Sequence, residues 1–422
     1  MPSAAYTDRM GHVRALPLRL ILTIAFLPIA LAALPGCVAP AGHVIAAVRA
    51  SAAHDTFNIV VWELRHAPDI VGALRAPQPD SAAIDEYFVT SARLREANAQ
   101  GARILAAQSI GDQATADALT RADAIADELA AIRPRATSGL RSLTEQALRE
   151  AGLVMDPPVL GEIVFPPVSF VMEELPRVLV VSPRERIDLM VSLPLRPDIS
   201  AEEVIRLEGV MEARGLSAVV TRIGGMGTYP ALVTPTSTLE FTLSTIVHEW
   251  VHHYLFFHPL GRTYGASTEM TTINETVANM IGLETAALAL GRPAPEFRVP
   301  EARPTPSAGQ RGAFDFGDFM RETRAEAEAL LAEGKIDEAE AYMEARRVDL
   351  VQNHGYAIRK INQAYFAFHG SYADSPTGGV ISPVYGQLIR VRAGSGSLGE
   401  FLRAARGIRT PEDLERLAAE QP

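Results

Sequence analysis

The chain has 422 residues, 48% of them hydrophobic, and a formal net charge of −11 at pH 7. This is the composition of a globular protein, long enough for one large domain or two modest ones. The acidic balance argues against a nucleic-acid partner, because binding to phosphates requires a basic surface. The single cysteine, Cys37, excludes an intrachain disulfide, so packing must supply the stability.

The N-terminus has the pattern of a targeting segment. Arginines precede an uncharged run at 20–34, which suits the apolar part of a signal peptide better than a spanning helix of about 20 residues. The run ends in a segment, 34–37, that resembles a bacterial lipobox, although Pro35 is unusual there. We therefore expect residues 1–37 to direct export to the cell envelope, with Cys37 lipidated and anchoring the protein to the membrane. An ordinary signal peptide or an uncleaved anchor is the alternative.

The next region is expected to be mostly helical. Residues 57–64 fit either a short strand or the start of a helix. The alanine-rich segment 82–132 has apolar residues at helical spacing, and residues 111–112 divide it into a hairpin. A further helix is expected over 137–150. Such spacing is typical of a packed helical layer; an arm that binds a partner is the alternative.

A mixed pattern of strands and one helix follows. Residues 168–173 and 177–181 are strand-like runs rich in β-branched residues, and 216–223 is a third. Between them, a capping box over 200–203 opens a helix that Gly215 ends. This order of elements suits an α+β fold.

One motif indicates a specific kind of chemistry. Residues 248–252 read His-Glu-Trp-Val-His, inside an apolar stretch, 239–256, with helical spacing. On a helix, His248 and His252 project from one face, which suits two nitrogens at about 2.0–2.1 Å from one Zn²⁺. Glu249 lies next to the first ligand, where it can deprotonate a metal-bound water. The alternative is a core helix whose histidines are merely hydrogen-bonded.

A catalytic zinc site needs a third protein ligand and one open position. Glu275 lies in segment 269–290, which also has helical spacing, so a returning helix can bring it back to the histidines. Asn279 is one turn further on and could hydrogen-bond a ligand histidine. The rival third ligands are Glu269, His253, His258 and Glu284.

The two motifs together resemble the gluzincin metallopeptidases, in which an HExxH helix is followed by a helix carrying Asn-Glu, as at Asn274-Glu275. The resemblance implies that the two histidines and Glu275 bind zinc and that Glu249 is the general base. In that family an aspartate stands four residues after the glutamate. This chain has Asn279 there, so the charge around the ligands differs.

Three segments are also similar to a family of bacterial aminopeptidases, many of them predicted lipoproteins. They are residues 224–230, the HEWVH and NETVA pair, and Asn362-Gln363-Ala364 followed by Tyr372. The resemblance covers residues 175–405 and implies that Tyr372 is catalytic, donating to the developing oxyanion. Tyr365 and His369 are alternatives for that role, and each could equally be a core side chain.

The glycines of 224–228 allow a hypothesis about substrate. In zincins the strand before the motif helix lies at a sheet edge and pairs with the substrate backbone, and glycines there would let a peptide approach closely. A plain glycine turn is the alternative. An aminopeptidase also needs a carboxylate that binds the free ammonium group of its substrate. Segment 224–230 contains no acidic residue, so Glu240 and Glu269 are the candidates for this role.

The C-terminal part is expected to be a loop over 293–317 and then helices. Their expected ranges are 317–331, 335–351, 357–368, 398–405 and 411–419.

The sequence therefore predicts an α+β protein with a zincin-like metallopeptidase core at 156–292, made of a small mixed sheet and two zinc-bearing helices. A mostly helical region at 38–155 precedes this core, and a helical subdomain at 318–422 follows it. The predicted function is a secreted or membrane-anchored zinc metallopeptidase, an aminopeptidase by resemblance, acting on a peptide or protein. One alternative is an inactive envelope lipoprotein that uses a peptidase-like domain as a binding scaffold. A zinc hydrolase of non-peptide amides is the other.

Overall fold

The computed structural model describes residues 40–107, 113–157, 161–298, 314–369 and 383–421, all within the unit Pro40–Pro422. The predicted signal segment, Cys37 and Tyr372 lie outside these ranges. None of the helices in these ranges combines the length and apolar character that crossing a membrane would require.

The fold is α+β, and its strands form two separate sheets where the sequence predicted one. In the described ranges, the mixed sheet has the order β1-β6-β5, from β1 (Phe170–Met172), β5 (Gly225–Met226) and β6 (Ala231–Val233). Its β1 and β6 are parallel, while β5 is antiparallel to β6. The antiparallel sheet has the order β3-β2-β4, from β2 (Arg177–Pro183), β3 (Val191–Leu195) and β4 (Leu216–Arg222).

Occupied strand edges explain this division. β1 and β2 are neighbours in the chain, but β2 is already paired with β3 on one edge and β4 on the other. No edge of β2 is left for β1, which pairs with the later strand β6 instead. The strand β3 was not predicted, because Ser192 and Pro194 interrupt its apolar pattern. In the structure Ser192 lies opposite Val180 of β2, and Pro194 lies opposite Val178.

Helices cover both faces of the antiparallel sheet. Leu179 and Val181 face a cluster that includes α2 (Pro40–Ala52) and α7 (Ala201–Glu212), while Val178 and Val180 face α13 (Gln363–His369). Alternate residues of a strand point to opposite faces, so a strand buried on both sides becomes a continuous apolar run. The capping box of α7 is formed as predicted.

The helix predicted over 357–368 begins only at Gln363. Asn362 fixes this start: its Oδ1 accepts the Tyr365 N–H at 2.9 Å, and its Nδ2 donates to the carbonyl of Ala218 at 2.9 Å. The side chain therefore caps the helix and ties it to β4, a signal that apolar periodicity does not contain.

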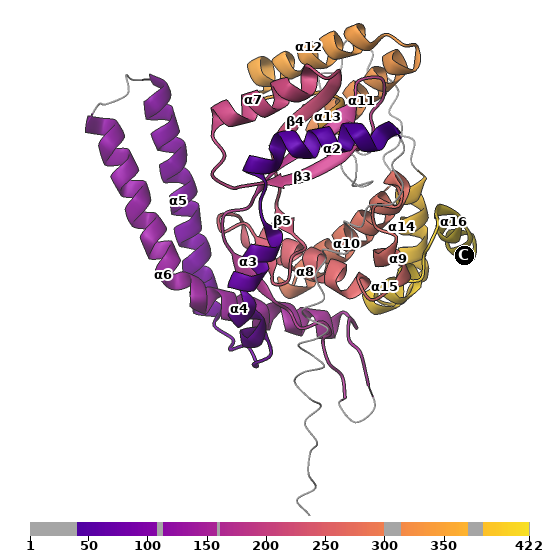
Figure 1. Ribbon diagram of the computed structural model, residues 1–422. Coiled ribbons are helices and arrows are strands. Elements are labelled where there is room, and N and C mark those ends of the chain that lie inside the picture. Colours follow the sequence, from indigo (N-terminus) through magenta and orange to yellow (C-terminus); the bar gives the residue numbers. More distant parts are fainter. Residues whose placement is uncertain (1–39, 108–112, 158–160, 299–313, 370–382, 422) are drawn as a thin grey trace, which may run out of the picture. The chain divides into compact units, whose positions relative to one another are not determined.

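The N-terminal elements are helical, as expected. They are the 3₁₀ turn η2 (Ala53–Asp55), α3 (Ile59–Arg65), α4 (Ala67–Ala73), α5 (Ser81–Ala107) and α6 (Gln113–Glu150). Residues 57–64 thus resolve as a helix start, with Asn58 accepting the Val61 N–H. Figure 1 shows α5 and α6 as a long antiparallel pair.

The separate helix expected over 137–150 was wrong, because α6 runs unbroken through Pro134. A proline inside a helix loses one backbone hydrogen bond and costs about 3 kcal/mol. Here Leu129, Ile132, Ala136 and Leu140 on both sides of it are buried in the main core. Burial of large apolar side chains, worth about 1.5–3 kcal/mol each, offsets that cost.

The main hydrophobic cluster joins the hairpin, the mixed sheet and the central and C-terminal helices. These helices are α8 (Leu239–Leu255), α9 (Pro259–Arg262), α10 (Thr268–Ala289), α14 (Val384–Gly394), α15 (Leu398–Ala405) and α16 (Pro411–Ala419). A smaller cluster joins α11 (Phe316–Ala332), α12 (Ile336–His354) and α13. The helices α15 and α16 have the predicted bounds, whereas α2 and α14 were not predicted.

Candidate metal centre

The motif histidines lie on α8, which begins directly after its N-cap residue, Thr238. The Thr238 side chain accepts the Phe241 N–H. Val247, Val251 and Leu255 are buried in the main core, and α8 packs against the neighbouring helix α10. His248 and His252 thus share one face, as their spacing predicted.

A glycine lets α10 lie directly against α8. A Cβ at Gly282 would come within 2.6 Å of the Ser244 carbonyl oxygen and 3.5 Å of the His248 Cβ. Only glycine allows this approach without a shift of the helices. Figure 1 shows α8 and α10 side by side. Glu275 lies two turns before Gly282 on α10, and its carboxylate lies beside the histidines of α8.

Three ligand-type atoms converge at this point. Nε2 of His248 and Nε2 of His252 are 3.0 Å apart. Oε2 of Glu275 lies 3.2 Å from the first nitrogen and 3.5 Å from the second. Ligand atoms held tetrahedrally at about 2.0–2.1 Å from zinc would be about 3.3–3.4 Å apart, which matches the observed separations.

Glu275 also leaves a buried polar atom without a well-formed hydrogen bond. Its Oε2 makes none within the described residues, although both imidazoles are close. An unsatisfied buried oxygen is costly, and a cation among the three atoms would remove that cost. The donor set of two imidazoles and one carboxylate is one that zinc accepts in catalytic sites. The residues therefore fit a zinc ion.

The two charges of the site are coupled. Burial alone would raise the pKa of Glu275, but His252 and His248 outweigh it and hold this pKa well below its ordinary value. For His252, burial lowers the pKa, yet Glu275 and to a smaller extent Glu249 bring it to about 9. Each group therefore favours the charged form of the other.

Glu249 is buried beside these ligands. Its carboxylate, with His248 and His252, also belongs to a group whose ligand atoms lie within 4.8 Å of one another. Burial raises the pKa of Glu249, opposed by the two histidines and assisted by Glu275. A carboxyl group with a raised pKa beside a potential metal position is suited to taking up and releasing a proton.

The strand β5 lies directly on this face of α8. A Cβ at Gly225 would clash with Oε1 of Glu249 and lie 2.6 Å from Thr245 Cγ2, and one at Gly227 would lie 3.3 Å from Oε2 of Glu249. These two glycines are therefore required for close packing of β5 against Glu249. That role differs from both the substrate approach and the plain turn considered for them.

The rival third ligands have other surroundings. Glu284 forms a two-point ion pair with Arg392, at 2.8 and 2.7 Å. His253 Nε2 is 2.7 Å from the Thr228 carbonyl oxygen, and burial lowers its pKa to about 4, so it is a neutral donor. His258 packs on the ring of Tyr254, and Glu269 is exposed. Among these candidates, only Glu275 has an oxygen near both motif histidines.

Tyr264 is a site residue that the sequence reasoning missed. Its hydroxyl donates to Oε1 of Glu275 at 2.6 Å, and its ring meets that of His252 edge-on. Glu275, and then burial, raise the pKa of Tyr264 well above its ordinary value, so it remains a donor. The available signal was a tyrosine in the short connection between the two helices that carry the ligands.

Among the described residues, no contact links the candidates for the oxyanion donor to His248, His252 or Glu275. Tyr372 lies outside the described residues. Tyr365 and His369 pack on each other on α13, whose main contacts are with β2 and β4. Burial lowers the pKa of His369 to about 4. Tyr365 and His369 are both partly buried there.

The candidates for a substrate-ammonium acceptor are at the surface. Glu240 is paired with Arg292 at 2.6 Å, and both side chains are more than half exposed. Glu269 is exposed in the first turn of α10.

Asn279, the residue expected to hydrogen-bond a ligand histidine, is half-buried on α10.

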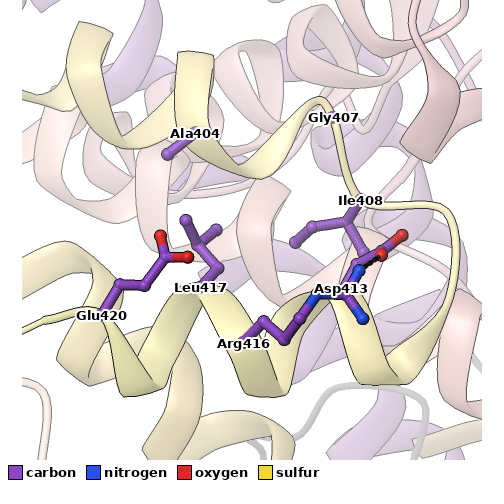
Figure 2. Close-up of a pocket in the computed structure, with 7 residues that line it drawn as sticks. All are labelled: Ala404, Gly407, Ile408, Asp413, Arg416, Leu417 and Glu420. Carbon is purple, nitrogen blue, oxygen red and sulfur yellow. Dashed lines mark hydrogen bonds and ion pairs between the residues drawn. The ribbon is translucent and has the colours of Figure 1, made fainter.

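A hollow elsewhere in the molecule is not part of this site. Figure 2 shows it between α15 and α16, with the ion pair of Asp413 and Arg416 on its wall. The remaining lining residues are Ala404, Gly407, Ile408, Leu417 and Glu420. It holds none of the motif residues.

The chain was compared with models of known protein families, with curated proteins and with solved structures, and no match was found. The functional conclusion therefore rests on the residues and geometry of this chain.

Proposed function

We propose that this protein is a zinc-dependent hydrolase of peptide bonds. The observation that carries the proposal is the convergence of Nε2 of His248, Nε2 of His252 and Oε2 of Glu275 within 3.0–3.5 Å of one another, where Oε2 makes no well-formed hydrogen bond. These three residues would hold the zinc ion in a zincin-like pair of helices. Glu249, buried beside them, would be the general base.

Zinc bound at this point would polarise an amide carbonyl and lower the pKa of a water molecule toward about 7. Glu249 would accept the proton of the attacking water and return it to the leaving nitrogen, so that the base ends the cycle ionised again. Its burial supports this role, because burial raises the pKa of a carboxyl group and so makes its carboxylate a stronger base.

The edge strand β5 supports a peptide as the substrate. In the mixed sheet it pairs with β6 on one side only, within the described ranges. Gly225 and Gly227 hold it against Glu249. An extended peptide that added a strand at the unpaired edge would place its backbone near the base through main-chain hydrogen bonds. Non-peptide amides lack such a repeated backbone and would not use this edge.

The first test is metal content by elemental analysis of the purified protein and its His248→Ala, His252→Ala and Glu275→Ala variants. We expect one zinc per chain, with binding weakened about 10²–10³-fold in each variant, since each ligand contributes about 3–4 kcal/mol. His258→Ala is the matched control, because it removes a histidine just beyond α8 whose ring packs on Tyr254.

A folded, metal-replete protein that binds no zinc would sink the hydrolase proposal and favour a peptidase-like binding scaffold. If zinc is bound, peptides with free and with blocked amino termini should be compared as substrates. Cleavage of the free form alone would support an aminopeptidase, whose ammonium acceptor would then have to be sought.

We also propose export and anchoring in the cell envelope through Cys37, on the pattern of residues 20–37. Cys37→Ser should move the protein from the membrane fraction to the soluble fraction of the envelope. An unchanged distribution would favour an uncleaved anchor.

A further inference from the structure

Tyr264 contacts the proposed third ligand through the carboxylate oxygen that is not the one paired with the histidines. Its hydroxyl donates to Oε1 of Glu275 at 2.6 Å, while the other oxygen, Oε2, is the one near His248 and His252. The two oxygens of one carboxylate thus have separate partners. The ring centroids of Tyr264 and His252 are 6.0 Å apart with the planes nearly perpendicular, so the tyrosine also borders a second ligand.

The backbone around Tyr264 is fixed by its own hydrogen bonds. The Tyr264 N–H donates to the Gly261 carbonyl at 3.2 Å, and the Gly265 N–H donates to Oγ1 of Thr271 at 3.2 Å. Gly265 has a φ of 76°, a conformation that glycine adopts at little cost. Asn274 donates to the Leu260 carbonyl and ties the connection to α10. These bonds fix the backbone from which the Tyr264 side chain projects.

A general structural role for Tyr264 does not account for this placement. The residue is 51% exposed and does not belong to the main hydrophobic cluster, whereas its hydroxyl lies against the buried carboxylate of Glu275. Tyr254 on α8 is the contrast: it is buried in the main cluster, and its hydroxyl accepts from Arg406. One tyrosine packs a core and the other directs its polar end at a buried carboxylate.

A carboxylate can bind a metal through one oxygen or through both. Two-oxygen binding would fill a further coordination position, whereas hydrolysis needs an open one. A hydrogen bond that occupies Oε1 favours binding through Oε2 alone and also prevents the side chain from turning. We propose that Tyr264 is a positioning residue that restrains Glu275 to bind the metal through one oxygen. This inference rests on the proposed function of the site.

The test compares Tyr264→Phe with Tyr254→Phe, which removes a hydroxyl that does not touch the ligands. Zinc affinity is measured by competition with a chelator of known affinity, and stability is measured on the metal-free protein. We expect Tyr264→Phe to bind zinc about 10–100-fold more weakly, the range typical for loss of a group that supports a ligand. Its metal-free unfolding midpoint should stay close to that of the wild type. Tyr254→Phe should lower the midpoint and leave zinc affinity unchanged.

A cobalt(II)-substituted protein gives a second readout. Visible absorption of cobalt depends on coordination number, so Tyr264→Phe should weaken the band as the freed Oε1 joins the metal. In a Glu275→Gln background, Tyr264→Phe should cause no further loss of metal affinity, because the coupling runs through the carboxylate.

Unchanged zinc affinity and an unchanged cobalt spectrum in Tyr264→Phe, with zinc bound normally by the wild type, would overturn the positioning role. An equal extra loss in the Glu275→Gln background would also overturn it, since the effect would not pass through Glu275. If the wild type itself binds no zinc, the proposed metal site is wrong, and so is the role of Tyr264. The wild-type measurement therefore distinguishes failure of the site from failure of the positioning role.

Discussion

The antiparallel sheet region and the α8–α10 helix pair both contain buried glutamates, but they surround them differently. Glu208 of α7 accepts hydrogen bonds from Arg359 at 2.9 Å, from Lys360 at 3.1 Å and from the Val220 N–H at 2.6 Å. Within the described residues, Glu249 and Glu275 form no ion pair with a lysine or arginine; their charged neighbours are histidines and each other.

This difference separates carboxylates that the fold itself neutralises from those proposed to act at a metal centre. A buried carboxylate is tolerated in a fold when cations and hydrogen bonds satisfy it, as they do at Glu208 and at Glu284, which pairs with Arg392. Two carboxylates buried around a pair of histidines lack a fixed cation of their own. The helix pair is therefore suited to binding an external cation, whereas the sheet region needs none.

The largest expected effect is on catalysis by Glu249. Glu249→Gln keeps the shape of the side chain but cannot accept the proton, so turnover of a cleaved peptide should fall about 10²–10⁴-fold. Zinc content should remain near one per chain. If this variant loses zinc as well as activity, Glu249 is a ligand, and its role as base is wrong.

The next effect concerns Glu275 and the stabilisation that zinc provides. A metal that binds only the folded state at about 1,000 times its Kd adds about 4 kcal/mol to the free energy of unfolding. We expect this gain in the wild type, measured by denaturant unfolding with and without zinc, and little of it in Glu275→Ala. Glu208→Ala should start from a lower stability yet keep the full gain from zinc. Equal gains in all three proteins would mean that zinc acts elsewhere.

A smaller effect is expected from the spacing of α8 and α10. In Gly282→Ala the new Cβ would clash with the Ser244 carbonyl oxygen. The free energy of unfolding should therefore fall by about 1–3 kcal/mol, and zinc affinity should fall as well. Gly209→Ala on α7 is the matched control, since no atom lies within 4 Å of its added Cβ. That variant should gain up to about 1 kcal/mol from better helix propensity. Loss of stability in both variants would refute the packing explanation.

The smallest effect is the pH dependence of the sheet region. Burial tends to raise the pKa of Glu208, but Arg359, Lys360 and the Val220 amide outweigh it and lower the pKa below its ordinary value. A lowered folded pKa gives stability that is present above the unfolded value of about 4.5 and is lost as pH falls through the folded value. Glu208→Gln should therefore cost about 1–2 kcal/mol near pH 7, because the half-exposed Arg359 can turn to solvent. The wild-type and variant stabilities should converge below pH 4; parallel curves would exclude this ion pair as the cause.

The sequence by itself determined what depends on near neighbours in the chain. The register of His248 and His252 on one face follows from helical periodicity, and the starts of α7, α15 and α16 follow from caps at Ser200, Ser397 and Thr410. Each of these features involves atoms within about one helical turn, so their residue types and spacing are sufficient to predict them.

Only the tertiary structure decided what depends on segments far apart in the chain. It divided the strands into two sheets because β2 had no edge left, and it carried α6 through Pro134 because the flanking side chains are buried. It also separated Glu275 from Glu284, two glutamates on one helix, by giving Arg392 to one and the motif histidines to the other. Spacing alone cannot choose between two carboxylates on the same helix, because the choice depends on which partners other elements bring to each.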